Sequence, residues 1–348
     1  MKLLIVTQAV DQHDPVLGFF VQWIEEFARH AERVEVICLR KGEYHLLSNV
    51  RVHSLGKERS TPRFARRLVY ASRFLRLAWR LRHGYDTVFV HMNPEYLVIA
   101  GWLWRLLGKR TALWYTHKSV NLKLRIAVFW ARVVFTASKE SFRLPTKKLQ
   151  IVGHGIDVAA FVAAPRRARR GAPLHILTIG RLAPSKRLAE MLAALDVLHR
   201  EGTAFSFTIA GVPATRADEG YERAVRADLI HKPYARTVTF LGAVSHASIP
   251  ALLAKADVFV NLSTTGSMDK AVLEALAAGV PAVTTNEAFR ELLEPAGLFV
   301  KDDIPEAIAA ALRTAATTDI APVSARIRAE YALPATISRI TAALSPGV

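Results

Sequence analysis

The feature that most constrains the fold of this chain is an alternation of apolar, β-rich runs with segments of helical period. In the first half the apolar runs lie at residues 2–7, 34–39, 87–91, 111–116, 133–138 and 149–154. Helix-period segments lie between most of them, notably at 19–30, 63–82 and 95–108. Continuous apolar strands that alternate with helices are typical of a parallel sheet covered on both faces.

The second half repeats the pattern. Strands are expected at 174–180, 205–211, 238–243, 258–262, 282–285 and 297–300, and helices at 187–200, 218–231, 247–255, 269–278 and 304–316. The sequence therefore predicts the α/β class, with two doubly wound, Rossmann-like domains at 1–162 and 173–333. A segment rich in Pro, Ala and Arg at 163–173 is typical of a linker. Ligands of such sheets bind at the carboxyl ends of the strands, so we expect the active site in a cleft between the domains.

The charge of the chain is unevenly placed. Residues 1–170 carry 30 Lys and Arg against 12 Asp and Glu, whereas residues 171–348 carry 17 against 18. A basic half can serve nucleic acid, a membrane surface or an acidic substrate. The single cysteine, Cys38, cannot form an internal disulfide and favours a reducing compartment. The longest apolar stretch, 96–108, is too short to span a bilayer, so we expect a cytoplasmic protein.

A cationic loop follows the first strand of the second half. Neither half has a G-x-G-x-x-G after its first strand, and no G-x-x-x-x-G-K-[ST] occurs. The segment "GRLAPSKR" (180–187) instead places Gly180 at the end of the strand, where a backbone can approach a ligand closely. Arg181 and Lys186 are suited to binding a diphosphate. Taken alone, these cations could equally be surface charges of an ordinary strand–helix loop.

The segment "STTGSMDKAVLEALAAG" (263–279) begins a helix with small, hydroxyl and charged residues. Such residues cap a helix, because they satisfy the unpaired N–H groups of its first turn. The same loop can instead leave those N–H groups open to a phosphate. Its place on a later strand of the sheet that carries Arg181 and Lys186 favours the phosphate site.

Together these residues resemble glycosyltransferase family 4, which has the GT-B fold. The resemblance lies in "GRLAPSK" (180–186), "FTIAG" (207–211), "VTFLGAVSHASIPALLAKADVFVNLS" (238–263), "DKAVLEALAAGVPAVTT" (269–285) and the linker "GHGIDVAAF" (153–161). The first half matches through "TQAVDQHDPVLGFF" (7–20) and "WYTHKS" (114–119). The resemblance implies transfer of a sugar from a nucleotide-sugar donor with retention at the anomeric carbon. It also implies that a last helix, at about 334–345, packs back on the first domain.

The resemblance implies a role for each matching residue. Arg181 and Lys186 would hold the diphosphate and stabilise the leaving nucleotide, backbone N–H groups at Lys270 and Ala271 would cradle a phosphate, and Glu274 would bind the ribose. His117 would face the donor sugar as a third catalytic residue, unless it is only a hydrogen-bonded strand-end histidine. The remaining donor-binding positions are Gly180, Gly242, Val244, Gly266, Ser267, Asp269 and Leu273, and the acceptor-side positions are Gly18, His91 and Lys118.

The chain departs from the family pattern at one point. Family members carry two glutamates eight positions apart; the second is Glu274, but the first is replaced by Gly266. Asp269 stands where the family has a glycine. Its carboxylate could cap the helix, pair with Lys270 or Lys186, or reach the donor sugar. Because Arg181, Lys186 and Glu274 are kept, we expect a working transferase with altered sugar contacts.

No D-x-D motif with an acidic pocket is found, and "KDDI" (301–304) lies far from the phosphate loop. Arg181 and Lys186 can do the work of a divalent ion, so we expect no cofactor and metal-independent turnover.

The basic half has a separate interpretation. In the helix at 62–82, Phe64, Leu68, Ala71, Leu75 and Trp79 are expected on one face, with Arg66, Arg73, Arg76 and Arg80 roughly opposite. That apolar face could simply pack on the sheet, while the arginines contact water or anionic lipid. We expect a lipid-linked or cell-envelope glycan as acceptor, at the inner membrane surface.

Two alternatives stay open. A nucleotide-sugar epimerase shares the fold, but its chemistry needs carboxylates and histidines that the first half scarcely offers. A basic binding protein for nucleic acid or membrane would explain the charge alone, yet the chain has no zinc spacing or helix-turn-helix, and we expect no nucleic-acid partner.

Overall fold

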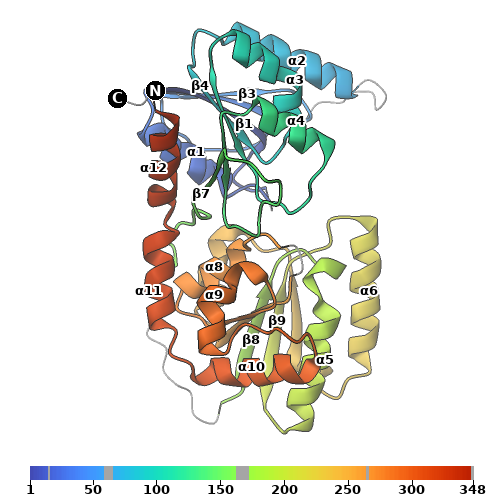
Figure 1. Ribbon diagram of the computed structural model, residues 1–348. Coiled ribbons are helices and arrows are strands. Elements are labelled where there is room, and N and C mark those ends of the chain that lie inside the picture. The colour runs from blue at the N-terminus through green and yellow to red at the C-terminus, as the bar shows by residue number, and fades with distance from the viewer. Residues whose placement is uncertain (15, 59–65, 162–171, 264–265, 346–348) are drawn as a thin grey trace. The chain divides into compact units, whose positions relative to one another are not determined.

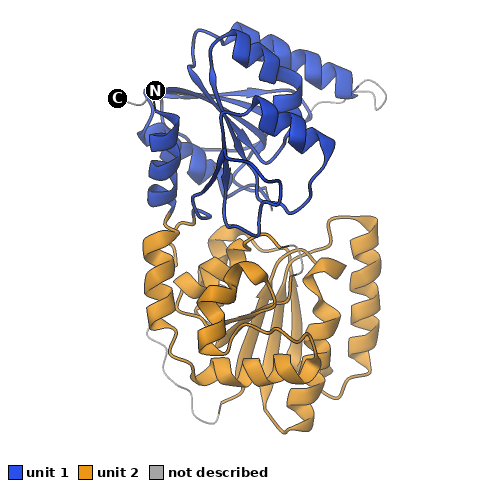
Figure 2. Cartoon of the chain, viewed as in Figure 1, with its two compact units in different colours: residues 1–155, 333–348 blue, residues 156–332 orange. Residues whose placement is uncertain are grey.

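The computed structural model describes residues 1–14, 16–58, 66–161, 172–263 and 266–345. Phe64, Thr264, Thr265 and most of the expected linker at 163–173 lie outside these residues. The chain divides into two compact units, one of residues 1–155 with 333–348 and one of 156–332 (Figure 2). The division therefore falls between Gly155 and Ile156 and again between Ala332 and Leu333.

Unit 1 is built on a seven-stranded sheet in the order β3-β2-β1-β4-β5-β6-β7, and every pair of neighbours is parallel. Its strands are β1 (Lys2–Val10), β2 (Arg33–Lys41), β3 (Val50–Ser54), β4 (Thr87–His91), β5 (Arg110–Trp114), β6 (Val133–Thr136) and β7 (Leu149–Ile151). Its helices are α1 (Phe20–Arg29), α2 (Arg66–Arg80), α3 (Glu95–Leu106), α4 (Leu122–Trp130) and α12 (Leu333–Leu344) (Figure 1).

Helices cover both faces of this sheet. One face packs against α2, α3 and α4 through an apolar core that includes Phe74, Trp104 and Leu124. The opposite face carries α1, whose Phe27 contacts Phe89 of β4 with ring centroids 4.9 Å apart. The final helix, α12, packs against α1 and so belongs to unit 1.

Unit 2 has a five-stranded parallel sheet in the order β10-β9-β8-β11-β12. Its strands are β8 (Leu174–Ile179), β9 (Phe205–Ala210), β10 (Val238–Gly242), β11 (Val258–Asn261) and β12 (Ala282–Thr284). Its α-helices are α5 (Leu188–Arg200), α6 (Arg216–Ile230), α7 (Ile249–Leu253), α8 (Lys270–Ala277), α9 (Arg290–Leu293), α10 (Pro305–Thr317) and α11 (Ala321–Glu330). Its short 3-10 helices are η1 (Pro184–Lys186), η2 (Ala235–Thr237), η3 (His246–Ser248), η4 (Glu287–Phe289) and η5 (Glu294–Ala296).

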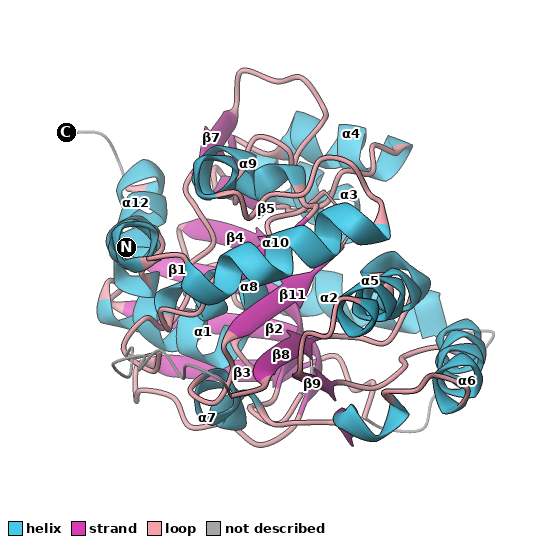
Figure 3. Cartoon of the chain, turned by 90° about the horizontal axis from the view of Figure 1, so that it is seen from below, coloured by secondary structure: helices cyan, strands magenta, loops and turns pink. Residues whose placement is uncertain are grey.

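Helix α10 packs against α5 and lies over β11 and β12 (Figure 3). The predicted α/β class with two doubly wound units is thus confirmed. One expected strand needs correction, because residues 297–300 form only a single bridge, Thr284 to Phe299. The edge strand β3 and the helices α4, α9 and α11 were not predicted from the sequence.

The predicted apolar face of α2 is wrong at Leu68 and Trp79, although Leu75 packs against the core as expected. The buried residues of this helix are Phe74 and Ala78, whereas Leu68 and Trp79 are exposed. Two apolar stripes run along the helix at similar spacing, and the one that carries the Phe74 ring packs into the core. Arg73 lies near the core side, because its guanidinium donates to the carbonyl of Leu55 at 2.8 Å. The outward stripe of Leu68 and Trp79 therefore shares its face with Arg76 and Arg80.

Gly211 shows why the carboxyl edge of the unit 2 sheet needs small residues. It follows β9 with φ of 144°, and a Cβ there would lie 1.8 Å from the carbonyl oxygen of Gly180. Gly211→Ala is therefore expected to lower the free energy of unfolding by about 2 kcal/mol or more. Denaturant unfolding measures the change. Gly220→Ala, inside α6 with open space around it, is the control and should be neutral or stabilising. Equal stability of both variants would contradict the close approach.

Candidate functional site

The expected donor-side residues of unit 2 gather at one edge of its sheet. All five strands are parallel, so the loops after them leave the same edge. Gly180 and Arg181 follow β8, Gly242 ends β10, and Ser263 follows β11. Strand β8 lies between β9 and β11. Strands β9 and β10 extend the sheet to one side of it, and β11 and β12 extend it to the other side. Such a switch point is where doubly wound sheets bind ligands.

The carboxylate of Asp269 ties three segments of this edge together. Asp269 is the N-cap of α8, and its Oδ1 accepts from the N–H of Ala271 at 3.2 Å. Its Oδ2 accepts from Asn261 Nδ2 at 3.1 Å and from the ammonium of Lys186. These contacts join the η1 loop, the end of β11 and the start of α8. Of the roles open to Asp269, the structure shows the cap and the pair with Lys186.

This arrangement alters the phosphate site that the sequence predicts. The N–H of Ala271, expected to cradle a phosphate, donates to Asp269. Part of the positive end of α8 is thus satisfied by a carboxylate of the chain itself. Burial alone would raise the pKa of Asp269, but the charge of Lys186 and the hydrogen bonds from Lys186, Asn261 and Ala271 lower it below its ordinary value.

Lys270 places a second ammonium beside this helix start. Burial lowers the pKa of Lys270 to about 7, although the negative charges of Glu274 and Asp269 act in the opposite direction. An amine with this pKa is partly neutral at physiological pH. A phosphate brought next to it would favour its charged form.

The two cations expected from the sequence differ in their surroundings. Lys186 lies across Gly180, since a Cβ at Gly180 would be 3.4 Å from Lys186 Cε. Arg181 is half exposed, and its Nε lies 3.9 Å from Asp218 Oδ2. Both line a small hollow with Gly180, Leu188 and Met191. An ammonium has three donors, of which Asp269 takes one.

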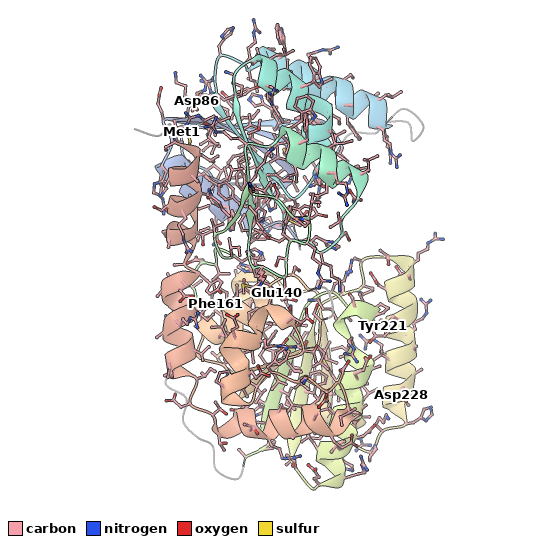
Figure 4. All side chains as sticks on the ribbon, in the orientation of Figure 1. Met1, Asp86, Glu140, Phe161, Tyr221 and Asp228 are labelled. Atoms are coloured by element: carbon pink, nitrogen blue, oxygen red, sulfur yellow. The ribbon has the colours of Figure 1, made fainter. Side chains whose placement is uncertain are left out.

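Glu274 is a buried, paired carboxylate and not a solvated helix residue. Its side chain is 5% exposed, and its Oε1 lies 2.9 Å from His246 Nε2. His246 begins η3, two residues after Val244, and its ring packs edge-on against Phe161, which is labelled in Figure 4. His246 was not among the site residues predicted from the sequence. The one available signal was its place in the loop that carries Gly242 and Val244.

The remaining donor-side positions have clear local roles. Gly266 has φ of 68°, a conformation that a glutamate adopts only with strain, so the glycine suits the backbone here. The carbonyl of Ser267 accepts from Asn286 Nδ2 at 2.7 Å. Leu273 is wholly buried, which places its side chain in the core and away from any ligand. Val244 is half-buried.

Unit 1 brings the acceptor-side residues to the carboxyl edge of its own sheet. Gly18 lies between β1 and α1, where a Cβ would approach the carbonyl oxygens of Asp14 and Gln12 to 2.7 and 2.8 Å. His91 ends β4 and is buried; its Nδ1 lies 3.2 Å from Thr7 Oγ1, and its ring stacks on Phe20 at 3.8 Å. These contacts are those of a hydrogen-bonded strand-end histidine.

His117 and Lys118 follow β5, the neighbour of β4, and both are exposed. The Nδ1 of His117 accepts from the N–H of Ser119 at 3.0 Å. This bond leaves Nε2 as the outward nitrogen of the ring. His117 thus lies on the same sheet edge as Gly18 and His91.

Among the described residues, no group of three His, Cys, Asp or Glu side chains could hold a metal ion. Within the same residues no helix is long and apolar enough to cross a membrane.

Comparison with known proteins first shows which class of protein this chain is similar to. Residues 173–318, from the start of the unit 2 sheet through α10, match the protein family described as Glycosyl transferases group 1. The whole chain superposes on the structure of Anabaena Alr3699/HepE in complex with UDP and glucose, with a TM-score of 0.78, 17% identity and 100% of both chains covered. This likeness shows the fold, which is the GT-B-like arrangement of two α/β units.

Particular relatives are similar over part of their length. A putative colanic acid biosynthesis glycosyltransferase, WcaL of Escherichia coli, is 29% identical over 71% of this chain and 57% of its own. A GDP-mannose-dependent α-(1-6)-phosphatidylinositol dimannoside mannosyltransferase of Mycobacterium tuberculosis is 31% identical over 68% of this chain and 60% of its own. The chain thus spans somewhat more than half the length of these relatives.

The contacts of Asp269 predict how the site responds to its loss. Asp269→Ala removes the cap of α8 and the acceptor of Lys186, so we expect the free energy of unfolding to fall by about 1 to 2 kcal/mol. If Asp269 acts only as the cap, turnover per folded enzyme should stay nearly intact. A fall in turnover of ~10-fold or more, or roughly 1.4 kcal/mol, together with weaker nucleoside-diphosphate binding would show that Asp269 holds Lys186 on the phosphates, and the same fall at unchanged affinity would place Asp269 on the sugar.

The lowered pKa of Asp269 predicts a pH dependence. A carboxyl whose pKa is depressed by folding stabilises the protein above its unfolded pKa of about 3.9, and this stability is lost as the pH falls through the folded pKa. Asp269→Asn keeps a capping side chain but no titrating group. The stability difference between the parent and Asp269→Asn should therefore shrink as the pH falls from 5 to below about 4, a range in which Lys270 is protonated in both proteins. Urea unfolding across this range checks it, and a constant difference down to pH 2 would refute it.

Proposed function

We propose that this chain is a glycosyltransferase that moves a sugar from a nucleotide-sugar to an acceptor. The observation that carries the proposal is the edge of the unit 2 sheet. There Arg181, Lys186 and the start of α8 meet beside the buried carboxylate of Glu274, inside the segment that matches Glycosyl transferases group 1. The likeness to Alr3699/HepE, whose structure holds UDP and glucose, supports a nucleotide-sugar as donor.

In the proposed reaction the bond between the anomeric carbon and the diphosphate oxygen breaks, and a bond from the acceptor oxygen forms on the same face. The acceptor hydroxyl gives its proton to the departing phosphate oxygen, so no strong base is required. Arg181 and Lys186 hold fixed positive charge where the leaving diphosphate gains negative charge, which lowers the barrier electrostatically. Glu274 accepts hydrogen bonds from the ribose, with His246 holding its other side.

We assign unit 1 to the acceptor, through the edge that carries Gly18 and Lys118, and propose that His117 on the same edge faces the donor sugar. The acceptor that we propose is a lipid-linked or cell-envelope glycan, met at the cytoplasmic face of the inner membrane. The names of the relatives support this class: one is a putative colanic acid biosynthesis glycosyltransferase and another a phosphatidylinositol dimannoside mannosyltransferase. The basic composition of residues 1–170 supports an anionic surface as partner.

Donor binding can be tested before the sugar is known. A ligand that binds only the folded protein raises its melting temperature, so a thermal-shift screen with UDP, GDP and ADP and their sugar conjugates should find at least one binder. No shift with any nucleoside diphosphate would overturn the assignment. Incubation of the donor without acceptor separates the enzyme classes, because an epimerase would change the sugar and a transferase would not.

Removal of either cation, Arg181 or Lys186, should lower the catalytic efficiency. Arg181→Ala and Lys186→Ala are each expected to lower kcat/KM by 10²-fold or more, as for loss of a group that binds developing charge, about 2.7 kcal/mol. Arg236→Ala and Lys255→Ala, at exposed positions elsewhere on unit 2, are the matched controls and should keep full activity. Similar kcat/KM in all four variants would remove the electrostatic role.

We also propose that turnover does not require a divalent ion, because Arg181, Lys186 and Lys270 already bring positive charge to the diphosphate. Activity should persist in excess EDTA after dialysis against chelator. Loss of turnover that Mg²⁺ or Mn²⁺ restores would show that a metal takes this role.

A further inference from the structure

Unit 1 carries an unusual surface on the side of its sheet covered by α2, α3 and α4. These helices bury one stripe each against the sheet, and α3 packs against both α2 and α4. Their other sides face outward. We define the outer helical face by its exposed large apolar residues, which are Leu68, Trp79, Trp102, Leu106, Leu122 and Phe129.

These side chains are far more exposed than core packing would leave them. Leu68 is 78% exposed, Leu106 77% and Phe129 65%, and the rings of Trp79 and Trp102 are about half exposed. In unit 2 the described residues of this kind are Val212, Ile230, Leu241 and Ile304, on separate elements. Large apolar groups that gather on one face of a folded unit mark an interaction site.

The charge around these side chains limits the choice of partner. The three helices α2, α3 and α4 carry eight Lys and Arg and one acidic residue, Glu95; the loop before β4 adds Asp86. Glu95 is already paired with Lys123 at 2.9 Å, and Asp86 accepts from the backbone N–H of Lys2 at 3.0 Å. The face therefore suits an anionic partner. A second copy of the same face would bring cations against cations.

The apolar and cationic groups alternate along each helix. On α2, Arg76 and Arg80 flank Trp79, and the guanidinium of Arg82 lies over the Trp79 ring at 4.3 Å. On α3, Arg105 lies between Trp102 and Leu106. Indole rings and leucines among arginines fit the boundary between headgroups and acyl chains, where apolar groups insert and guanidinium groups bind phosphates. Single-stranded nucleic acid would instead need a groove of stacking rings.

We infer that the outer helical face of α2, α3 and α4 docks on an anionic lipid bilayer by shallow insertion of Trp79, Trp102 and Leu106 between bound headgroups. The inference deepens the proposed function, on which its biological purpose rests, by naming the surface that brings unit 1 to a lipid-linked acceptor. The proposed function includes only the attraction of the basic residues to an anionic surface, and the inference adds the insertion of apolar side chains into the bilayer.

The first test is sedimentation with vesicles. One set holds equal parts of phosphatidylglycerol and phosphatidylcholine, and the other holds phosphatidylcholine alone. We expect the full chain to sediment with the anionic set. Arg76→Ser with Arg80→Ser should lower the partition coefficient by about tenfold or more, since each basic residue near such a surface contributes about fivefold. Arg223→Ser with Arg236→Ser, two exposed arginines of unit 2, removes the same charge, is the matched control and should bind as the parent does.

The second test detects insertion itself. Brominated lipids quench tryptophans that enter the acyl region, so they should quench the parent and quench Trp79→Phe with Trp102→Phe much less. Trp102→Ser with Leu106→Ser should also weaken the binding that remains at high salt, where charge is screened. All altered side chains face outward, so we expect the variants to fold. Melting temperatures equal to that of the parent will check this.

Several outcomes would overturn the inference. The first is equal recovery of the parent in both supernatants at low salt. The second is binding of the variants of the outer helical face that equals that of the parent. The third is a dimer or an RNA complex that these variants abolish, in a protein that does not bind vesicles. The nucleoside-diphosphate thermal shift distinguishes the two proposals. A chain that binds the nucleotide but no vesicle refutes only the docking surface, and the reverse result refutes only the transferase.

Discussion

Parallel pairing of strands is the constraint on which the rest of this structure depends. Because every strand in each sheet runs the same way, every loop that follows a strand leaves the same edge. Residues as distant in sequence as Gly180, Gly242 and Asp269 are thereby brought to one place. The helices needed to return the chain cover both faces of the sheet, so the edge is where polar groups can meet a ligand.

At that edge in unit 2, one carboxylate organises the local charge. Asp269 receives the helix N–H, the amide of Asn261 and the ammonium of Lys186, which fixes the lysine across Gly180. A side chain at Gly211 would collide with the carbonyl oxygen of Gly180, so the loops after β8 and β9 can approach each other only with a glycine there. Glu274, one turn along α8, has its own partner in His246. The two carboxylates thus have different partners, Lys186 and His246, and Lys270 lies between them in the sequence.

Unit 1 has the same kind of parallel sheet, but its sheet edge and its outer helices carry different features. Its polar edge holds His91 in the core and leaves His117 exposed, so the two histidines that look alike in sequence have different surroundings. Its outer helices keep large apolar side chains and arginines on one surface. A helix layer that served only to cover the sheet would gain nothing from exposing Leu106 and Phe129, since burial of such groups is what stabilises a fold.

The sequence by itself determined the fold class, most element positions and the residues at the strand ends, because apolar period and glycine placement are local signals. It could not choose which of two apolar stripes on α2 faces the sheet, since both have helical spacing and only the fit of Phe74 into the core decides. It also missed β3, an edge strand with a polar face. The pairs Asp269 with Lys186 and Glu274 with His246 join residues 83 and 28 positions apart. Only the tertiary structure could select them, because the sequence offers several possible partners to each carboxylate and the geometry of the sheet edge brings one of them into contact.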